Sequence, residues 1–180
     1  MLRAILILSL LCFKAFAADA SASLAKELQP FQPLLGTWKG EFVGGKSEKP
    51  AVDVVTFERA LNGKAIRVLH SVNDGIYAGE TIVMWNPEAK RIETFYFTTT
   101  GDRTEGYMEA GKEGVFTSGE TLKNLDSKEG SDQVTQVRAM TKILPDGRLH
   151  VKSEYLKNGG WQPGHEIFYK PDPTAKVVFK

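Results

Sequence analysis

Two of the three histidines lie where an imidazole can do chemistry. His70 alternates with Ile66 and Val68, and His165 alternates with Ile167. Because successive side chains of a strand point to opposite faces, both imidazoles are predicted to share an inward, apolar face. A histidine that faces inward has three possible roles. It is a core residue bonded to a hydroxyl or carbonyl group, it contacts a ligand, or it binds a metal or haem iron.

The sequence contains none of the common motifs for nucleophilic catalysis, metal binding or phosphate binding. There is no Cys-x-x-Cys-His, His-x-His, His-Glu-x-x-His or Gly-x-Ser-x-Gly pattern, and no glycine-rich phosphate loop. His150 alternates with Lys152 and is expected to face water. Carboxylates that could pair, such as Glu80 with Glu105 or Glu120, are expected on the exterior. No cofactor or metal is therefore predicted, and catalysis is not the favoured role.

Aromatic residues on the inward phase complete the candidate ligand contacts. The phase of the segment 91 to 99 stays open, because Tyr96 alternates with Phe95 and Phe97. Some inward aromatic residues must be ordinary core. The candidate ligand-binding residues are Trp38, Phe42, His70, Tyr77, Trp85, Tyr155, Trp161, His165 and Tyr169.

The elements that must position these side chains are predicted to be strands. Turn sequences such as Asn62-Gly63 and Asn158-Gly159-Gly160 recur at the spacing of a meander, and no window after residue 30 has sustained helical periodicity. The ten predicted strands cover 37 to 43, 52 to 60, 65 to 73, 76 to 85, 91 to 99, 103 to 109, 114 to 121, 133 to 144, 148 to 157 and 161 to 170. Closure hides their edges, so we predict an all-β, up-and-down antiparallel barrel of about ten strands.

A short helix is expected ahead of the first strand. Ser21 or Ser23 could cap it, the leucines at positions 24 and 28 share one face, and Pro30 and Pro33 would end it. This helix and its lead-in occupy 18–36, and the barrel domain occupies 37–171. Residues 172–180 form a tail or a last edge strand, and the polar stretch 123 to 132 is expected to be a long exposed loop.

The first seventeen residues have the composition of an export signal. Arg3 precedes an apolar run from residue 4 to 13, and Ala15-Phe16-Ala17 provides small residues for cleavage after Ala17 or after Ala20. The run is too short for a permanent membrane anchor. Cys12 lies within it, so the mature chain has no cysteine and no disulfide. We therefore expect an exported protein, periplasmic or secreted.

The charge of the mature chain excludes several classes of partner. Removing Arg3 and Lys14 leaves 21 basic against 22 acidic residues, a net charge of −1. Nucleic acid as a partner would require a basic stripe, and the sequence has none. No polybasic run favours a membrane surface either. The sequence does not indicate an oligomeric state.

Residues around the first strand resemble a known group of barrels. A short helix followed by Pro33-Leu34-Leu35-Gly36-Thr37-Trp38-Lys39-Gly40 resembles the opening of the calycin group, which includes lipocalins, fatty-acid-binding proteins and bacterial lipocalin-like domains. Gly36 and Trp38 are the matching positions. The segment 159 to 169 is similar to the last hairpin of exported bacterial lipocalin-like domains. This resemblance implies a barrel for a small apolar or amphipathic molecule, with Trp38 covering one end.

One lipocalin feature is missing from the last strand. In lipocalins an arginine of that strand packs across the conserved tryptophan, and no arginine occurs between 161 and 170. Arg138 or Lys170 is left as the candidate to pack on Trp38.

A second resemblance is to the haem-binding nitrobindin-like barrels. They also open with Gly-x-Trp-x-Gly and carry a late histidine that binds iron, which Gly36, Trp38, Gly40 and His165 match. The glycine-rich run and the Tyr-Pro-Thr that follow in that group do not occur here. This resemblance implies haem bound through His165.

The leading hypothesis is therefore an exported lipocalin-like barrel that binds a small hydrophobic ligand without catalysis. A haem-binding barrel is the first alternative, and a barrel with a filled core that serves as a structural or interaction module is another. An enzyme acting on a small hydrophobic substrate is a third, which would rest on inward histidine and glutamate side chains.

Overall fold

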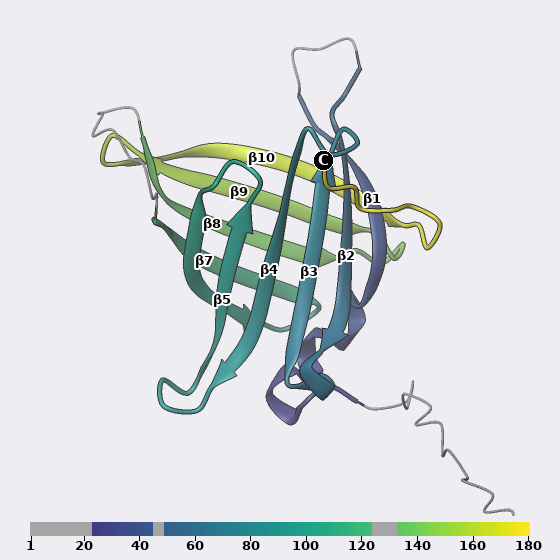
Figure 1. The fold of residues 1–180 in the computed structure, drawn as a ribbon, viewed down its shortest axis with the longest axis vertical. Helices are drawn as coiled ribbons and strands as arrows, with labels where there is room; N and C mark the ends of the chain where they lie inside the picture. Colours follow the sequence, from purple (N-terminus) through teal and green to yellow (C-terminus); the bar gives the residue numbers. More distant parts are fainter. Residues whose placement is uncertain (1–22, 45–48, 124–132) are drawn as a thin grey trace, which may run out of the picture.

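The computed structural model describes residues 23–44, 49–123 and 133–180, so the predicted export signal and most of the predicted loop at 123 to 132 lie outside the described residues. Ten strands form one closed antiparallel barrel, in which each strand pairs with its neighbours in sequence and the last pairs with the first (Figure 1). The strands are β1 (Gly36–Phe42), β2 (Val52–Ala60), β3 (Ala65–Val72), β4 (Tyr77–Asn86), β5 (Arg91–Thr98), β6 (Arg103–Ala110), β7 (Val115–Lys123), β8 (Val134–Ile143), β9 (Leu149–Lys157) and β10 (Gly160–Pro171). The predicted all-β barrel is confirmed.

Short turns explain why the strands follow each other in order. Between β9 and β10, Lys157 pairs with Gly160, which leaves only Asn158 and Gly159 in the turn. Both of these residues have positive φ, 53° and 74°. This is the geometry of a two-residue hairpin whose twist matches that of the flanking strands. Local turn chemistry of this kind favours an up-and-down meander.

The N-terminal helix differs from the prediction. It is a 3₁₀ segment, η1 (Lys26–Leu34), preceded by Ala25 without a side-chain cap, and Pro30 and Pro33 lie inside it rather than ending it. Proline lacks the backbone N–H that a regular α-helix requires, so the segment winds in tighter 3₁₀ turns. A second 3₁₀ turn, η2 (Leu61–Gly63), joins β2 to β3.

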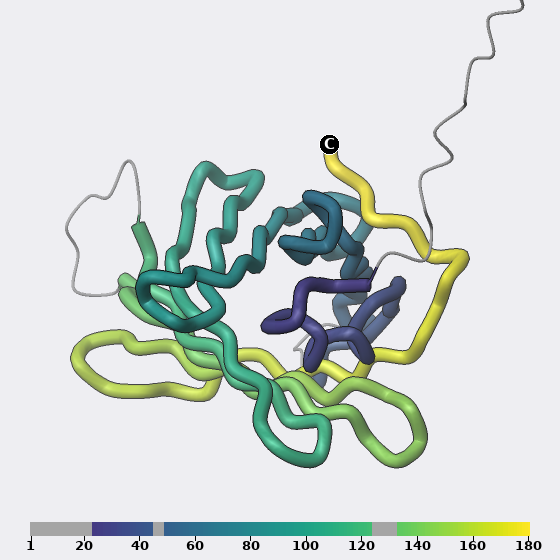
Figure 2. Tube along the Cα trace, turned by 90° about the horizontal axis from the view of Figure 1, so that it is seen from below, coloured from purple at the N-terminus to yellow at the C-terminus, as the bar shows by residue number. Residues whose placement is uncertain are grey.

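The η1 segment closes one end of the barrel. Figure 2 shows it lying across the opening, inside the ring of strands. Its Leu28, Phe31 and Leu34 side chains, together with Leu24, are almost completely buried, and the Phe31 ring lies 5.4 Å from the ring of Phe116 in β7. The Trp38 indole Nε1 donates to the Leu34 carbonyl at 2.9 Å, which ties β1 to this segment. The hydrophobic core therefore fills this end of the barrel.

Residues after Pro171 form no further strand in the structure. The chain turns at Asp172, whose backbone N–H donates to the Thr37 carbonyl. It then crosses the outside of the first strands, where the Val178 N–H donates to the Ser71 hydroxyl at 3.0 Å (Figure 1). Because β10 already pairs with β1, the barrel has no free edge to which a strand could be added.

Candidate functional site

A cavity of about 660 Å³ lies inside the barrel. Each of the ten strands contributes at least one side chain to its wall. Apolar side chains line the cavity around the barrel, and they are Phe42, Ala51, Val55, Val68, Val72, Leu122, Val137, Ala139 and Ile167. The rest of the wall carries hydroxyl, imidazole and carboxyl groups, so the cavity has an amphipathic lining.

Most of the side chains singled out in the sequence reach this cavity. Phe42, His70, Tyr77, Tyr155, His165 and Tyr169 line it. Trp38 and Trp85 also belong to the interior, but they pack in the hydrophobic core beside η1 and do not line the cavity. Trp161 is placed elsewhere.

Trp161 lies on the outer face, contrary to the expectation that it points inward. It is 38% exposed, and the Arg138 guanidinium lies 4.2 Å from its ring centre. The pairing of β10 with β9 shifts register between Pro163 and Glu166. One extra residue in a strand reverses the alternation of side chains, so Trp161 and His165 face opposite sides.

This bulge fixes the position of His165. A Cβ atom at Gly164 would collide with the Ser153 hydroxyl, so only glycine fits beside it. The Ser153 Oγ accepts the His165 backbone N–H at 2.9 Å and lies 3.0 Å from the ring Nδ1. The Tyr155 hydroxyl lies 2.7 Å from the same nitrogen. Backbone and ring are thus both held by β9.

The surroundings of the His165 imidazole favour its neutral form. Burial lowers its pKa below the usual value, because the charged form loses hydration. Within the described part of the chain, its Nε2 has no hydrogen-bond partner, while the residue lines the cavity. This nitrogen is therefore available to a ligand.

A buried carboxyl group organises the opposite part of the wall. Asp53 is only 4% exposed, and one of its oxygens lies 3.2 Å from the His70 Nδ1. The Tyr169 hydroxyl donates to its other oxygen at 2.6 Å. Buried carboxylates need such partners to offset lost hydration. Both oxygens of Asp53 are therefore used within the wall.

Two phenols extend this hydrogen-bonded chain. The Tyr96 hydroxyl lies 2.8 Å from the His70 Nε2, and the Tyr77 hydroxyl lies 2.7 Å from that of Tyr96. Burial raises the pKa of both phenols, so both stay protonated at neutral pH. The chain from Asp53 through His70 to Tyr77 thus joins side chains from four consecutive strands, β2 to β5.

Glu120 is an interior residue, and its predicted exterior position is wrong. It lines the cavity, accepts a hydrogen bond from the Thr104 hydroxyl, and lies over Gly106, where a Cβ atom would collide with it. Burial raises the pKa of its carboxyl group. Glu80 and Glu105, by contrast, form ion pairs with arginines on partly exposed side chains. Strand β7 therefore has one carboxyl group that faces inward, and the polar residues around it in the sequence do not indicate this.

Several wall residues were not identified from the sequence. They are Asp53, Tyr96, Thr104, Glu120 and Ser153. Asp53 has the same phase as Val55 and Phe57, so alternation could have placed it inward. For Tyr96, the competing phenylalanines on either side obscured the phase, and the structure puts Tyr96 on the inner face.

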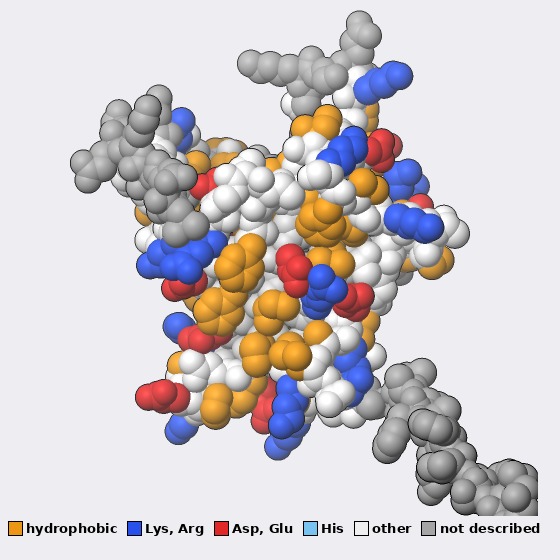
Figure 3. All heavy atoms as spheres, in the orientation of Figure 1, with side chains coloured by type: hydrophobic (Ala, Val, Ile, Leu, Met, Phe, Trp, Pro, Cys, Tyr) orange, Lys and Arg blue, Asp and Glu red, His pale blue; other side chains and the backbone are white. Residues whose placement is uncertain are grey.

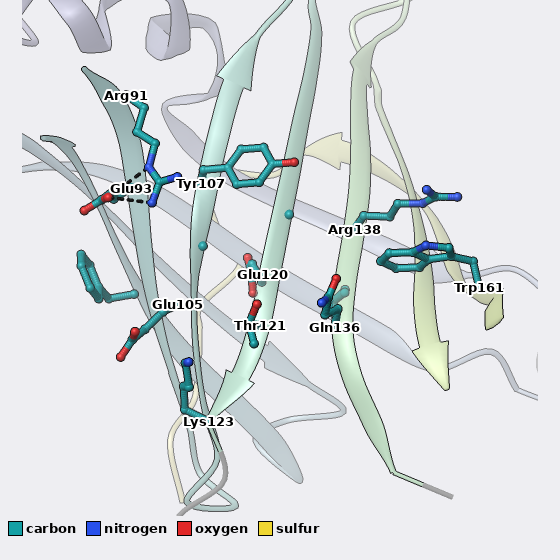
Figure 4. A pocket seen from close by; sticks show the side chains of 14 residues that line it. Arg91, Glu93, Glu105, Tyr107, Glu120, Thr121, Lys123, Gln136, Arg138 and Trp161 are labelled. Atoms are coloured by element: carbon teal, nitrogen blue, oxygen red, sulfur yellow. Dashed lines mark hydrogen bonds and ion pairs between the residues drawn. The ribbon is translucent and has the colours of Figure 1, made fainter. Parts of the chain in front are cut away.

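A second hollow, of about 480 Å³, lies on the outer face of β5 to β8, and Glu120 borders it as well as the cavity inside the barrel (Figure 4). Arg91 donates two hydrogen bonds to Glu93 at one side of it, and Arg138 lies over Trp161 at the other. The sequence left Arg138 or Lys170 as the candidate to pack on Trp38. The Arg138 guanidinium packs on Trp161 instead. Lys170 pairs with Lys39 on the exposed side of the barrel and does not replace the missing arginine.

The outer surface also carries an apolar patch over β4 and β5 (Figure 3). Ile82 and Phe95 lie opposite each other across these strands, and Phe97 is 50% exposed. The ion pairs of Arg67 with Glu58 and Glu80 adjoin it. His150 lies on the outer face as well, stacked on Phe168 at 4.2 Å and bonded to Glu166.

Among residues 23–44, 49–123 and 133–180, no three histidine, cysteine, aspartate or glutamate side chains gather as metal ligands. In the same described ranges, no helical segment has the length and hydropathy to span a bilayer.

Comparison with known proteins defines the fold but not the activity. No family model matches the sequence, and no curated protein is detectably similar to it. The crystal structure of Rv2717c from M. tuberculosis is similar, with a TM-score of 0.60 and 16% sequence identity over 83% of this chain and 99% of that one. At this identity the likeness extends to the barrel fold alone.

Proposed function

We propose that this protein is an exported, lipocalin-like barrel that binds a small amphipathic molecule in its interior. The observation that carries the proposal is the cavity of about 660 Å³, whose wall carries both apolar and polar side chains. Small-molecule sites are concave, mostly apolar and supplied with a few oriented polar groups, in roughly this range of volume. A filled-core module would not need such a space.

The polar groups of the wall are already oriented before any ligand arrives. Asp53, His70 and Tyr96 hold one another in a hydrogen-bonded chain, and Ser153 and Tyr155 hold His165. Groups held in this way bind a ligand at a lower entropic cost than freely rotating side chains. We infer that this order serves recognition of a ligand.

Native mass spectrometry and a fluorescent reporter test the proposal together. The protein, purified from its own host, is expected to retain a small molecule that dissociates on unfolding. After removal of that molecule, the uncharged dye N-phenyl-1-naphthylamine should bind with a single saturable site and increased fluorescence. A bare protein that also fails to bind the dye would contradict a ligand-binding role.

Export is part of the proposal and has its own test. The support is the charged start, short apolar run and Ala15-Phe16-Ala17 segment of the sequence. Expression of the full chain in a bacterium should yield a protein in the exported fraction that begins at Ala18 or Ser21. A protein that keeps Met1 and stays in the cytoplasm would disprove export.

Haem binding is the second candidate, and one observation favours it. His165 lines the cavity with a neutral imidazole whose Nε2 has no partner among the described residues. Neutral imidazole is a common axial ligand of haem iron. Haem titration would then produce a Soret band that is lost in His165→Ala and retained in His150→Ala, which alters the outer face. The absence of a band in the wild-type protein would end this candidate.

A further inference from the structure

We propose that the ligand of the cavity carries a protonated amine on an apolar or aromatic body, and that Glu120 and the Tyr77 and Tyr96 hydroxyls receive the amine. The inference rests on the proposed function, because it assigns a chemical class to the ligand of the same cavity. It follows from the charge of the wall, the direction of its hydrogen bonds and one unused carboxyl oxygen.

The wall of the cavity contains acidic side chains but no lysine or arginine among the described residues. Three carboxyl groups line the cavity, those of Asp53, Asp102 and Glu120. A negative, partly water-excluding site attracts cations and repels anions more strongly than the same charges in bulk water. An anionic ligand, such as a fatty acid, is therefore disfavoured by this lining.

The hydrogen bonds from Asp53 through His70 to the two phenols run in one direction. The Asp53 oxygens accept, so the His70 Nδ1 carries the proton of this contact, and in that tautomer of the uncharged ring Nε2 is an acceptor. Tyr96 then donates to His70, and Tyr77 donates to Tyr96. Both phenol protons are consumed inside the wall, and what remains are oxygen lone pairs. The phenols therefore present acceptors to the cavity, which match a donor on the ligand.

Glu120 has one carboxyl oxygen that is not used by the described residues. The Thr104 hydroxyl donates to its Oε2, and no donor to its Oε1 is present among the described residues. Glu120 lines the same cavity as Tyr77 and Tyr96, and its carboxyl group adds to the rise in the pKa of both phenols. Burial without a cation raises the pKa of this group. An ammonium group beside it would replace the lost hydration and restore the carboxylate.

The rest of the cavity suits the body of such a ligand. The aromatic rings of Phe42, Tyr77 and Tyr155 line it, and ring faces attract cations and stack with aromatic groups. The valine side chains at positions 55, 68 and 72 supply an apolar wall. A hydrophobic amine satisfies both surfaces at once.

A matched probe series tests the inference on the full mature chain. Three compounds share a 2-naphthylethyl body and carry an ammonium, a hydroxyl or a carboxylate group. Each competes with N-phenyl-1-naphthylamine, which reports on the cavity itself. The ammonium compound is expected to displace the dye at a concentration at least about tenfold lower than the hydroxyl compound, because a charge-assisted hydrogen bond contributes that much or more.

Two variants locate the effect. Glu120→Gln keeps an acceptor and a similar shape but removes the charge, so the preference for the ammonium compound should fall to about threefold or less. Glu105→Gln removes a carboxyl group from the next strand that points outward, and it should retain the full preference. The dye should bind Glu105→Gln as it binds the wild type. Its affinity for Glu120→Gln is measured separately, so that each displacement is expressed relative to the dye affinity of the same variant.

Each result decides something. Equal displacement by the three compounds, or strongest displacement by the carboxylate, would overturn the amine inference while leaving a ligand-binding cavity intact. A preference that survives Glu120→Gln would overturn the assignment to Glu120. If the wild-type protein is isolated without a bound molecule and also fails to bind the dye, the proposed function fails and the amine inference fails with it.

Discussion

At the residue scale, the carboxyl group of Glu120 links the stability of the barrel to pH. Burial raises its pKa in the folded protein, so there is a pH window in which the folded chain holds a proton that the unfolded chain has released. The free energy of unfolding therefore falls as pH rises through this window. The window begins near the ordinary pKa of glutamate, about 4.3.

Glu120→Gln tests this linkage. The variant is expected to be more stable than the wild type at pH 8, and the difference should shrink as pH falls to about 4, because Glu120 is then mostly protonated in both states. Urea unfolding at both pH values measures it, with Glu105→Gln as the exposed control. A variant that is less stable than the wild type at pH 8 would show that the carboxylate has a strong partner in the fold.

Tyr169 offers a second test at this scale. Its hydroxyl donates to the buried Asp53, and Tyr169→Phe leaves that carboxyl oxygen without this donor. Loss of a hydrogen bond to a charged group costs about 1.5 to 3 kcal/mol, measured as the free energy of unfolding. Tyr107→Phe, which alters a phenol that is 40% exposed, should change stability by less than about 0.5 kcal/mol. Equal effects would mean that the Asp53 contact contributes little.

At the scale of the elements, the bulge in β10 decides which residues face the cavity. Gly164→Ala places a methyl group against the Ser153 hydroxyl, so either β9 or the bulge must shift. We expect a loss of about 1 to 3 kcal/mol in the free energy of unfolding. The displacement should also change the NMR signals of the His165 ring.

Gly160→Ala is the matched control in the same strand. A Cβ atom at Gly160 would meet nothing within 4 Å, and this residue has no positive φ. Its stability and the His165 signals should remain close to those of the wild type. If both variants behave alike, the bulge does not depend on the contact between Gly164 and Ser153.

At the scale of the whole molecule, the barrel divides into a packed end and a hollow end. The core beside η1 contributes stability, whereas the cavity provides room for a ligand. Ala139→Phe enlarges a side chain that lines the cavity, so the affinity for N-phenyl-1-naphthylamine should fall at least about tenfold at a stability cost of about 1 to 3 kcal/mol. Met140→Phe changes its outward neighbour and should leave the affinity unchanged. Undiminished binding in Ala139→Phe would place the dye outside the barrel.

The sequence by itself determined the class of fold and the order of its strands. Asn158-Gly159 and similar turns set where strands end, and alternation over the segment 52 to 60 or 65 to 72 sets which side chains share a face. These signals are local, because turn geometry and the period of a strand involve only near neighbours in the chain. The number and ends of the strands could therefore be predicted to within two residues.

Only the tertiary structure decided which inward side chains meet and where the alternation of side chains is reversed. The bond between Asp53 and Tyr169 joins residues 116 positions apart, and it exists because the first and last strands meet when the barrel closes. One extra residue near Gly164 turns Trp161 outward while His165 stays inward. Such contacts depend on register between distant strands, and a shift of one residue reverses every side chain, so no local pattern encodes them.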